Sequence, residues 1–127
     1  MAIILVVEDE DQVRVLAESI LRDAGHRTLS AAAVDQALAL VRAEPAVELI
    51  FTDINLADDA EAGLVHPGLE LAQQARRLRP QLRVLYTTGA VITDGMRALF
   101  VEDGCFLAKP YDMEQLSTKI AEMVAGK

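Results

Sequence analysis

Five short apolar runs, separated by stretches with helical periodicity, constrain the fold of this chain more than any other feature. The runs cover residues 3–7, 26–30, 47–52, 82–87 and 105–108, and the second is the weakest. Runs of this length, rich in aliphatic residues and bounded by Gly, Pro or acidic residues, predict buried strands. Strands that alternate with helices predict an α/β domain with a parallel sheet and right-handed crossovers.

The stretches between these runs have apolar residues every three or four positions, which is the spacing of an amphipathic helix. The clearest stretch contains Val13, Leu16, Ala17, Ile20, Leu21 and Ala24. Asp11 is placed to cap this helix at its N-terminus, and Gly25 to close its C-terminus. Asp112 and Gln115 have the spacing of a capping box for the last helix.

Two segments depart from this plain alternation. The connection over residues 56–68 exceeds the roughly 2–6 residues usual between a strand and a helix, and a short helical turn within it remains an open alternative. The helix expected near residues 96–100 is short and poorly marked. The helix before Pro80 carries three arginines that we expect on its solvated side, Arg76, Arg77 and Arg79.

Composition excludes several classes of protein. The formal net charge of −8 and the isoelectric point near 4.6 argue against binding to nucleic-acid backbones or anionic membranes. Cys105 is the single cysteine, so an internal disulfide is excluded. No apolar run reaches the ~18 residues of a membrane span, and residues 1–7 lack the basic start of a signal peptide. We expect one cytoplasmic domain, residues 1–127, without nucleic-acid or membrane partners.

Polar side chains follow four of the five predicted strands. Glu8 and Asp9 follow the first, Asp53 the third, Thr88 the fourth and Lys109 the fifth. A single acid in such a place is more often a turn residue or a helix cap. Because the carboxyl ends of parallel strands share one edge of a sheet, where ligands bind in open α/β folds, we expect these five groups to converge.

The chemistry of the group favours a cation site. Carboxylates packed together repel one another, so their site binds protons or a cation. Oxygen ligands suit Mg²⁺ better than Zn²⁺, because the isolated His26 and His66 have no ligand spacing. Lys109 has two possible roles, to pair with a carboxylate or to hold an incoming anion, and Thr88 offers a hydroxyl donor.

Four motifs together resemble the receiver domain of bacterial two-component response regulators, of the CheY-like, stand-alone type. The motifs are Val6 to Glu10, Thr52 to Asn55, Tyr86 to Gly89 and Phe106 to Pro110. The resemblance covers the whole chain and implies a flavodoxin-like (βα)5 fold. Its five-stranded parallel sheet has the order 2-1-3-4-5, helices on both faces, and a switch point between strands one and three.

The resemblance also implies a reaction and a metal. Asp53 is the expected phosphoacceptor, which takes a phosphoryl group from a phosphohistidine. Mg²⁺, or Mn²⁺ as a substitute, is expected on Asp9, Asp53 and the backbone carbonyl of Asn55, with Glu8 bound directly or through water. The cation would neutralise charge between an anionic nucleophile and an anionic phosphoryl group.

The resemblance also implies roles for four more residues. Lys109 is expected to pair with the phosphoryl oxygens, and Thr88 to hydrogen-bond the same group after transfer. Phe106 stands where the family has an aromatic ring that changes rotamer, although a buried core Phe is an equally good interpretation. The Lys109–Pro110 peptide bond is expected to be cis.

The leading hypothesis is a single-domain response regulator rather than an enzyme, with self-phosphorylation and autodephosphorylation as its only reactions. Its expected partners are a sensor histidine kinase or histidine phosphotransfer protein and a downstream protein. An alternative is a Mg²⁺-dependent phosphohydrolase with an aspartyl-phosphate intermediate. Such enzymes usually have a second Asp where this chain has Asn55. A flavin-binding protein is the third hypothesis, but the acids after the first strand would repel a flavin phosphate.

Overall fold

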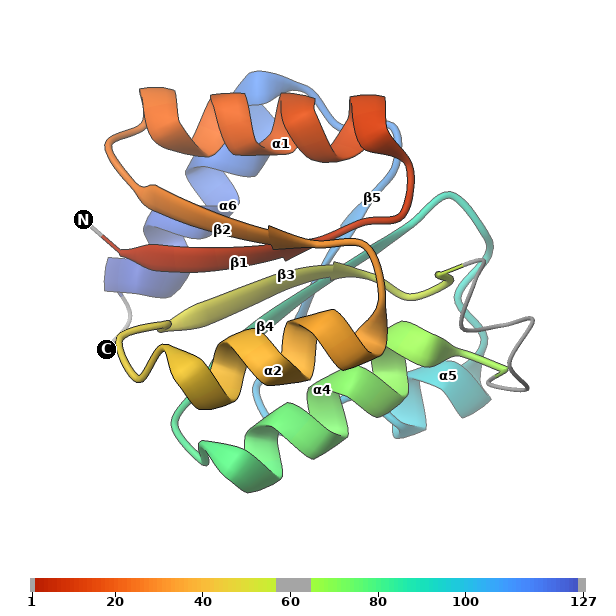
Figure 1. Ribbon diagram of the computed structural model, residues 1–127. Coiled ribbons are helices and arrows are strands. Elements are labelled where there is room, and N and C mark those ends of the chain that lie inside the picture. Colours follow the sequence, from red (N-terminus) through yellow and green to blue (C-terminus); the bar gives the residue numbers. More distant parts are fainter. Residues whose placement is uncertain (1, 57–64, 126–127) are drawn as a thin grey trace.

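Five parallel strands form one sheet in the order β2-β1-β3-β4-β5, as the sequence predicted (Figure 1). The structure, a computed structural model, describes residues 2–56 and 65–125. The strands are β1 (Ile3–Val7), β2 (Arg27–Ala31), β3 (Leu49–Asp53), β4 (Arg83–Thr88) and β5 (Cys105–Ala108). The chain is therefore flavodoxin-like, and its β1 and β3 are neighbours although β2 lies between them in sequence.

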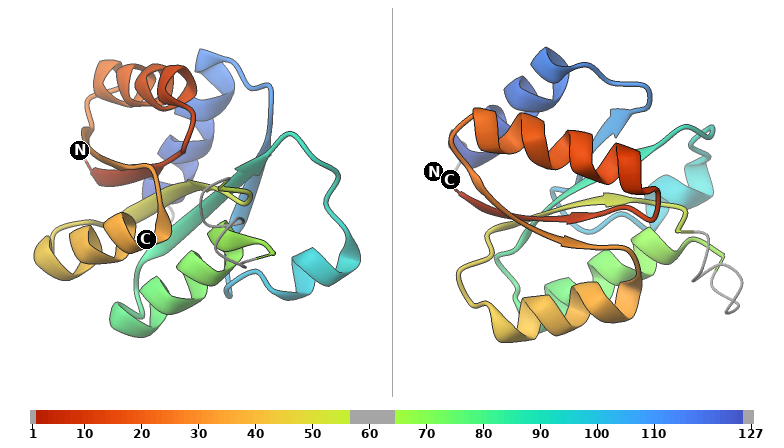
Figure 2. Two further views of the ribbon diagram at one scale, coloured as in Figure 1. Left: turned by 45° about the vertical axis from the view of Figure 1, so that its right-hand side comes forward. Right: turned by 45° about the horizontal axis from the view of Figure 1, so that its top comes forward.

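Helices cover both faces of the sheet. In the described residues they are α1 (Asp11–Asp23), α2 (Val34–Ala43), α4 (Pro67–Leu78), α5 (Asp94–Ala98) and α6 (Met113–Ala125). Figures 1 and 2 show α1 and α6 on one face and α2, α4 and α5 on the other. None of the helices in the described part of the chain is long and apolar enough to span a bilayer.

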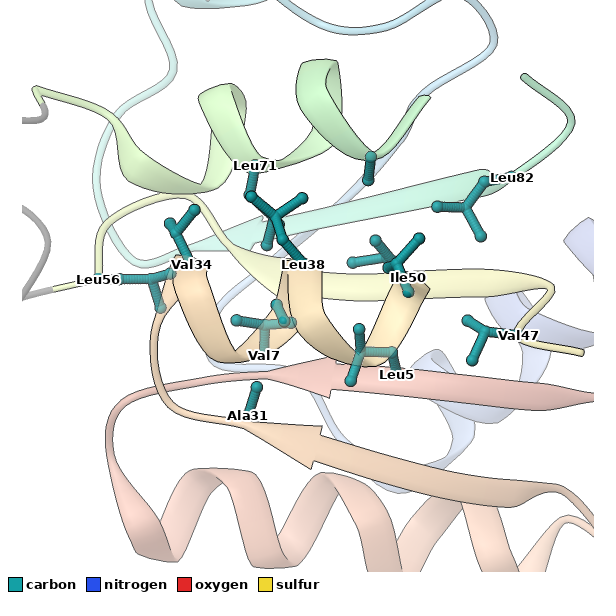
Figure 3. Close-up of a cluster of buried hydrophobic side chains, with 13 residues drawn as sticks. Leu5, Val7, Ala31, Val34, Leu38, Val47, Ile50, Leu56, Leu71 and Leu82 are labelled. Carbon is teal, nitrogen blue, oxygen red and sulfur yellow. The ribbon is translucent and has the colours of Figure 1, made fainter. Parts of the chain in front are cut away.

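The strands have apolar residues at successive positions because each face of the sheet packs against helices. Leu5 and Ile50 belong to the core beneath α2 and α4, shown in Figure 3. Ile4, Val6 and Phe51 point the opposite way, into the core beneath α1 and α6. Burial on both sides fixes the register of the central strands, since a shift of one residue would exchange the two faces.

Two of the predicted helix ends are confirmed. The Gly25 N–H donates to the Arg22 carbonyl and the His26 N–H to the Leu21 carbonyl, a Schellman pattern with Gly25 at φ 94°. At α6, the Asp112 N–H donates to the Gln115 side chain at 2.9 Å and the Gln115 N–H to the Asp112 carboxylate at 2.8 Å. This reciprocal pair is the expected capping box.

The prediction that Asp11 caps α1 is wrong. Glu10 is the N-cap residue and makes no side-chain capping bond, whereas Asp11 lies in the first turn. The Asp11 carboxylate accepts a hydrogen bond from Arg14 Nη2 at 2.6 Å, and Arg14 Nη1 donates to the Glu8 carbonyl at 2.8 Å. Arg14 thus draws Asp11 away from the backbone and joins α1 to the end of β1.

Two further expectations have mixed outcomes. The helix near residues 96–100 is short, as expected, because α5 has five residues. Arg79 does not lie on the solvated side of its helix, because its guanidinium donates to the carbonyls of Val41 and Val47. Val41 lies in the last turn of α2 and Val47 in the connection that leads to β3, so helix geometry supplies no partner for either carbonyl. The possible helical turn in the 56–68 connection falls largely on residues 57–64, outside the described residues.

Candidate functional site

The sheet order brings the predicted polar residues to one edge. The edge carries Glu8 and Asp9 after β1, Asp53 at the end of β3, Thr88 at the end of β4 and Lys109 after β5. Because β3 lies between β1 and β4, Asp53 has the two acids on one side and the hydroxyl and ammonium groups on the other. The edge lies where the β1 and β3 connections diverge to opposite faces, the topological switch point of such sheets.

Three carboxylates gather at this edge. Ligand-capable oxygens of Glu8, Asp9 and Asp53 all lie within 4.8 Å of one another. Glu8 is only 5% exposed and Asp53 only 7%. The pKa of Glu8 is raised to about 7, chiefly by burial and also by the nearby Asp9 and Asp53, while Lys109 offsets part of the rise. Negative charge here is costly without a cation.

Lys109 supplies a positive charge from the far side of the cluster. Its Nζ lies 2.6 Å from Glu8 Oε1 and 2.6 Å from Asp53 Oδ2, so one ammonium bridges two buried acids. Burial alone would lower the pKa of Lys109, but hydrogen bonds to Asp53 and Glu8 raise it above its ordinary value. Lys109 therefore stays charged and pairs with both carboxylates.

The Asp53 carboxylate is held at both oxygens. Oδ2 accepts from Lys109, and Oδ1 accepts from the Asn55 backbone N–H at 2.8 Å. Gly68, at the start of α4, packs against the backbone of this residue and donates its N–H to the Ile54 carbonyl at 2.8 Å. The close contact between α4 and the end of β3 fixes the position of the Asp53 backbone.

The Thr88 hydroxyl is joined to the site through Asn55. Thr88 Oγ1 accepts from Asn55 Nδ2 at 3.2 Å and from the Ala90 N–H at 3.2 Å. Asn55 Oδ1 lies 3.3 Å from His66 Nδ1. His66 was expected to be an isolated histidine. In the sequence, only its position directly before Pro67 and Gly68, at the start of α4, connects it with the site. The fold brings it to the site.

Two other residues assigned by resemblance lie beside the site. Phe106 is partly buried and packs against the core cluster that includes Ile54 and Tyr86. The Lys109–Pro110 peptide bond is cis.

Tyr111, which sequence reasoning missed, packs edge to face against Phe51, with 5.6 Å between the ring centroids. Burial is the main reason that the pKa of Tyr111 is raised to about 12.

The donor set fits a hard divalent cation. Carboxylate oxygens are the ligands that Mg²⁺ and Ca²⁺ prefer. One oxygen from each of the three side chains lies within 4.8 Å of the other two, which is close enough for them to be gathered around one ion with bonds of roughly 2.1 Å. Glu8, Asp9 and Asp53 are thus the residues whose side chains could hold such an ion.

Comparisons with known proteins agree with this geometry. Residues 4–121 match the family described as the response regulator receiver domain. The CheY-like receiver domain protein from Methanospirillum hungatei JF-1 is 25% identical, with a TM-score of 0.84, over 99% of this chain and 95% of that one. The receiver domain of the hybrid histidine kinase CckA is 26% identical, with a TM-score of 0.78, over 97% and 99%. NtrX from Brucella abortus is 32% identical, with a TM-score of 0.79, over 98% of this chain and 27% of that one.

Proposed function

The chain belongs to the response regulator receiver domain family, and from this premise we propose that Asp53 accepts a phosphoryl group from a phosphohistidine. The observation that carries the proposal is the central place of Asp53. Its carboxylate lies within the acidic cluster and also within 2.6 Å of the Lys109 ammonium. A nucleophile between a cation site and a fixed positive charge can approach an anionic phosphoryl group with less repulsion.

The transfer needs no proton on the nucleophile. An Asp53 carboxylate oxygen forms a bond to phosphorus as the bond from phosphorus to the donor ring nitrogen breaks. The electron pair of the broken bond stays on that nitrogen, and a neutral imidazole leaves because its other ring nitrogen carries a proton. The acidic residues Glu8, Asp9 and Asp53, with the Asn55 backbone carbonyl, would hold Mg²⁺ or Mn²⁺. The cation supplies charge neutralisation and alignment. Lys109 and Thr88 then donate hydrogen bonds to the phosphoryl oxygens.

The output of this reaction is a change in protein contacts. Residues 1–127 form one receiver domain that takes its phosphoryl group from a sensor histidine kinase or a histidine phosphotransfer protein. The modified domain binds a downstream protein or passes the group on. Phosphorylation acts by shifting an equilibrium between two conformations of the Thr88 region, and the ring of Phe106 moves with it.

The phosphohydrolase alternative has no support at the position that distinguishes it. The residue two places after Asp53 is Asn55, whose carboxamide neither gains nor loses a proton near neutral pH. The Asn55 side chain is instead bound to Thr88 and faces His66. Asn55 therefore connects Asp53, the proposed phosphoacceptor, to Thr88 rather than acting as a general acid.

Millimolar Mg²⁺ is expected to raise the melting temperature. At ten times the dissociation constant, one cation bound only by the folded state adds about 1.4 kcal/mol, or roughly 3–6 °C for a domain of this size. Thermal unfolding with Mg²⁺ and with EDTA measures this shift. The Asp9→Asn variant should lose most of it, and a shift that survives Asp9→Asn unchanged would place the ion elsewhere.

Acetyl phosphate with Mg²⁺ should add one phosphoryl group, as read by intact-protein mass spectrometry. The Asp53→Asn variant should gain nothing, because an amide is not a nucleophile at this site. Asp112→Asn, in the exposed capping box of α6, is the matched control and should be labelled like the wild type. Equal labelling of wild type and Asp53→Asn would refute the assignment.

A further inference from the structure

His66 belongs to a row of three side chains in contact that ends at the Thr88 hydroxyl. His66 Nδ1 lies 3.3 Å from Asn55 Oδ1, and Asn55 Nδ2 donates to Thr88 Oγ1 at 3.2 Å. The three residues come from the start of α4, the end of β3 and the end of β4. Segments far apart in sequence thus meet at Asn55, whose backbone N–H donates to Asp53 Oδ1 at 2.8 Å.

The backbone holds His66 in place. The His66 carbonyl accepts from the Leu69 N–H at 3.1 Å and the Glu70 N–H at 3.3 Å. Two residues on, the Gly68 N–H is bonded to the Ile54 carbonyl. The imidazole is therefore attached to a helix end that is itself fixed against β3, so its distance to Asn55 is set by the packing of α4.

The hydrogen-bond roles in this chain follow from the Asn55 carboxamide. Its nitrogen donates to Thr88, so its oxygen faces His66 and can only accept. A hydrogen bond across this contact requires the tautomer in which His66 Nδ1 carries the proton. Thr88 Oγ1 already accepts two hydrogen bonds, from Asn55 Nδ2 and the Ala90 N–H, which occupy both of its lone pairs. The only capacity left to the Thr88 hydroxyl is to donate.

We propose that His66 is a positioning residue that keeps the Thr88 hydroxyl available as a donor to a phosphoryl group on Asp53. The proposal rests on the proposed function of Asp53. Without the His66 donor, the Asn55 carboxamide is free to flip, and its oxygen then accepts the Thr88 proton. A hydroxyl engaged in this way is lost to the phosphoryl oxygens, so the phosphorylated form loses one hydrogen bond.

Binding of beryllofluoride, a phosphoryl-shaped anion, in the presence of Mg²⁺ tests the proposal by calorimetry. His66→Leu removes the donor at similar size, whereas His66→Asn keeps an N–H donor the same number of bonds from the backbone. We expect His66→Leu to weaken binding about two- to thirteen-fold, the range for one neutral hydrogen bond, and His66→Asn to stay near the wild type.

A double-mutant cycle with Thr88→Val separates positioning from a general effect on structure. If His66 acts through the Thr88 hydroxyl, His66→Leu should have no further effect once that hydroxyl is gone. An equal loss in both backgrounds, or an equal loss in His66→Leu and His66→Asn, would overturn the inference. If the wild type binds no beryllofluoride, the proposed function itself fails. If the wild type binds beryllofluoride normally and His66→Leu has no effect, the positioning role of His66 is rejected and the proposed function of Asp53 stands.

Discussion

Replacing Lys109 by methionine should lower the free energy of unfolding by about 3 kcal/mol at neutral pH, the cost of leaving buried charges without their partner. The ammonium lies 2.6 Å from both Glu8 and Asp53, and it is the cation that the structure pairs with each of these acids. Methionine keeps much of the side-chain length but not the charge. Urea or thermal unfolding of the metal-free protein measures the loss.

The loss should depend on pH in a defined direction. With Lys109 in place, the pKa of Glu8 is raised to about 7, above its ordinary value, because burial outweighs the lowering effect of the ammonium. Removing the Lys109 ammonium raises the pKa of Glu8 further. The folded variant therefore binds more protons than the unfolded chain at mildly acidic pH. Its stability is therefore retained near pH 5 and falls as the pH rises through about 7 and above.

A surface lysine provides the control for this prediction. Lys119 lies 3.9 Å from Glu122 in an exposed pair, and Lys119→Met should change stability by less than about 0.5 kcal/mol with little pH dependence. Mg²⁺ should stabilise Lys109→Met more than the wild type, because the added cation replaces the missing ammonium. If the two methionine variants behave alike, the bridge does not stabilise the fold.

Gly68→Ala should destabilise the fold strongly, because among the described glycines Gly68 has the closest backbone neighbours. A Cβ at this position would lie 2.0 Å from the Asp53 carbonyl oxygen and 2.7 Å from Ile54 Cα, so α4 or β3 would have to move. We expect a loss of roughly 3 kcal/mol or more in stability. Because the displaced backbone is that of Asp53, labelling by acetyl phosphate should fall as well.

Gly89→Ala is the matched control, because it also adds one methyl group beside the site. Its Cβ would be 3.9 Å from Lys109 Cβ, an ordinary contact, and Gly89 does not have a positive φ. We expect Gly89→Ala to gain about 0.4–1 kcal/mol through the unfolded state. Unfolding and labelling measured in parallel distinguish the two glycines, and similar behaviour would mean that α4 accommodates a side chain at residue 68.

Much of the fold could be predicted because the relevant signals are local. Aliphatic runs such as Ile3–Val7 predict strands that are buried on both faces. The capping box of Asp112 and Gln115 is recognised from a spacing of three residues alone. The convergence of Glu8, Asp53 and Lys109 followed from the rule that parallel strands share their carboxyl ends. The strand order came from the family resemblance, since neither periodicity nor spacing determines it.

The features that were missed depend on contacts between distant segments. His66 reaches Asn55 only because Gly68 allows α4 to pack closely on β3, and nothing in the sequence near His66 reports that distance. Arg79 was expected in solvent, but two carbonyls from other elements accept its hydrogen bonds. Asp11 has a good capping side chain, yet Arg14 competes for it. Each outcome was decided by tertiary geometry rather than by local propensity.

Identifying the phosphorylated residue tests the central claim most directly. Borohydride reduces an acyl phosphate on aspartate to homoserine, and trypsin separates residues 1–14, which contain Glu8 and Asp9, from residues 43–76, which contain Asp53. After treatment with Mg²⁺ and acetyl phosphate, we predict homoserine at position 53, read from the fragment masses of the second peptide. Reduction confined to the first peptide, or to another acid of the second, would contradict the account of Asp53 as the phosphoacceptor.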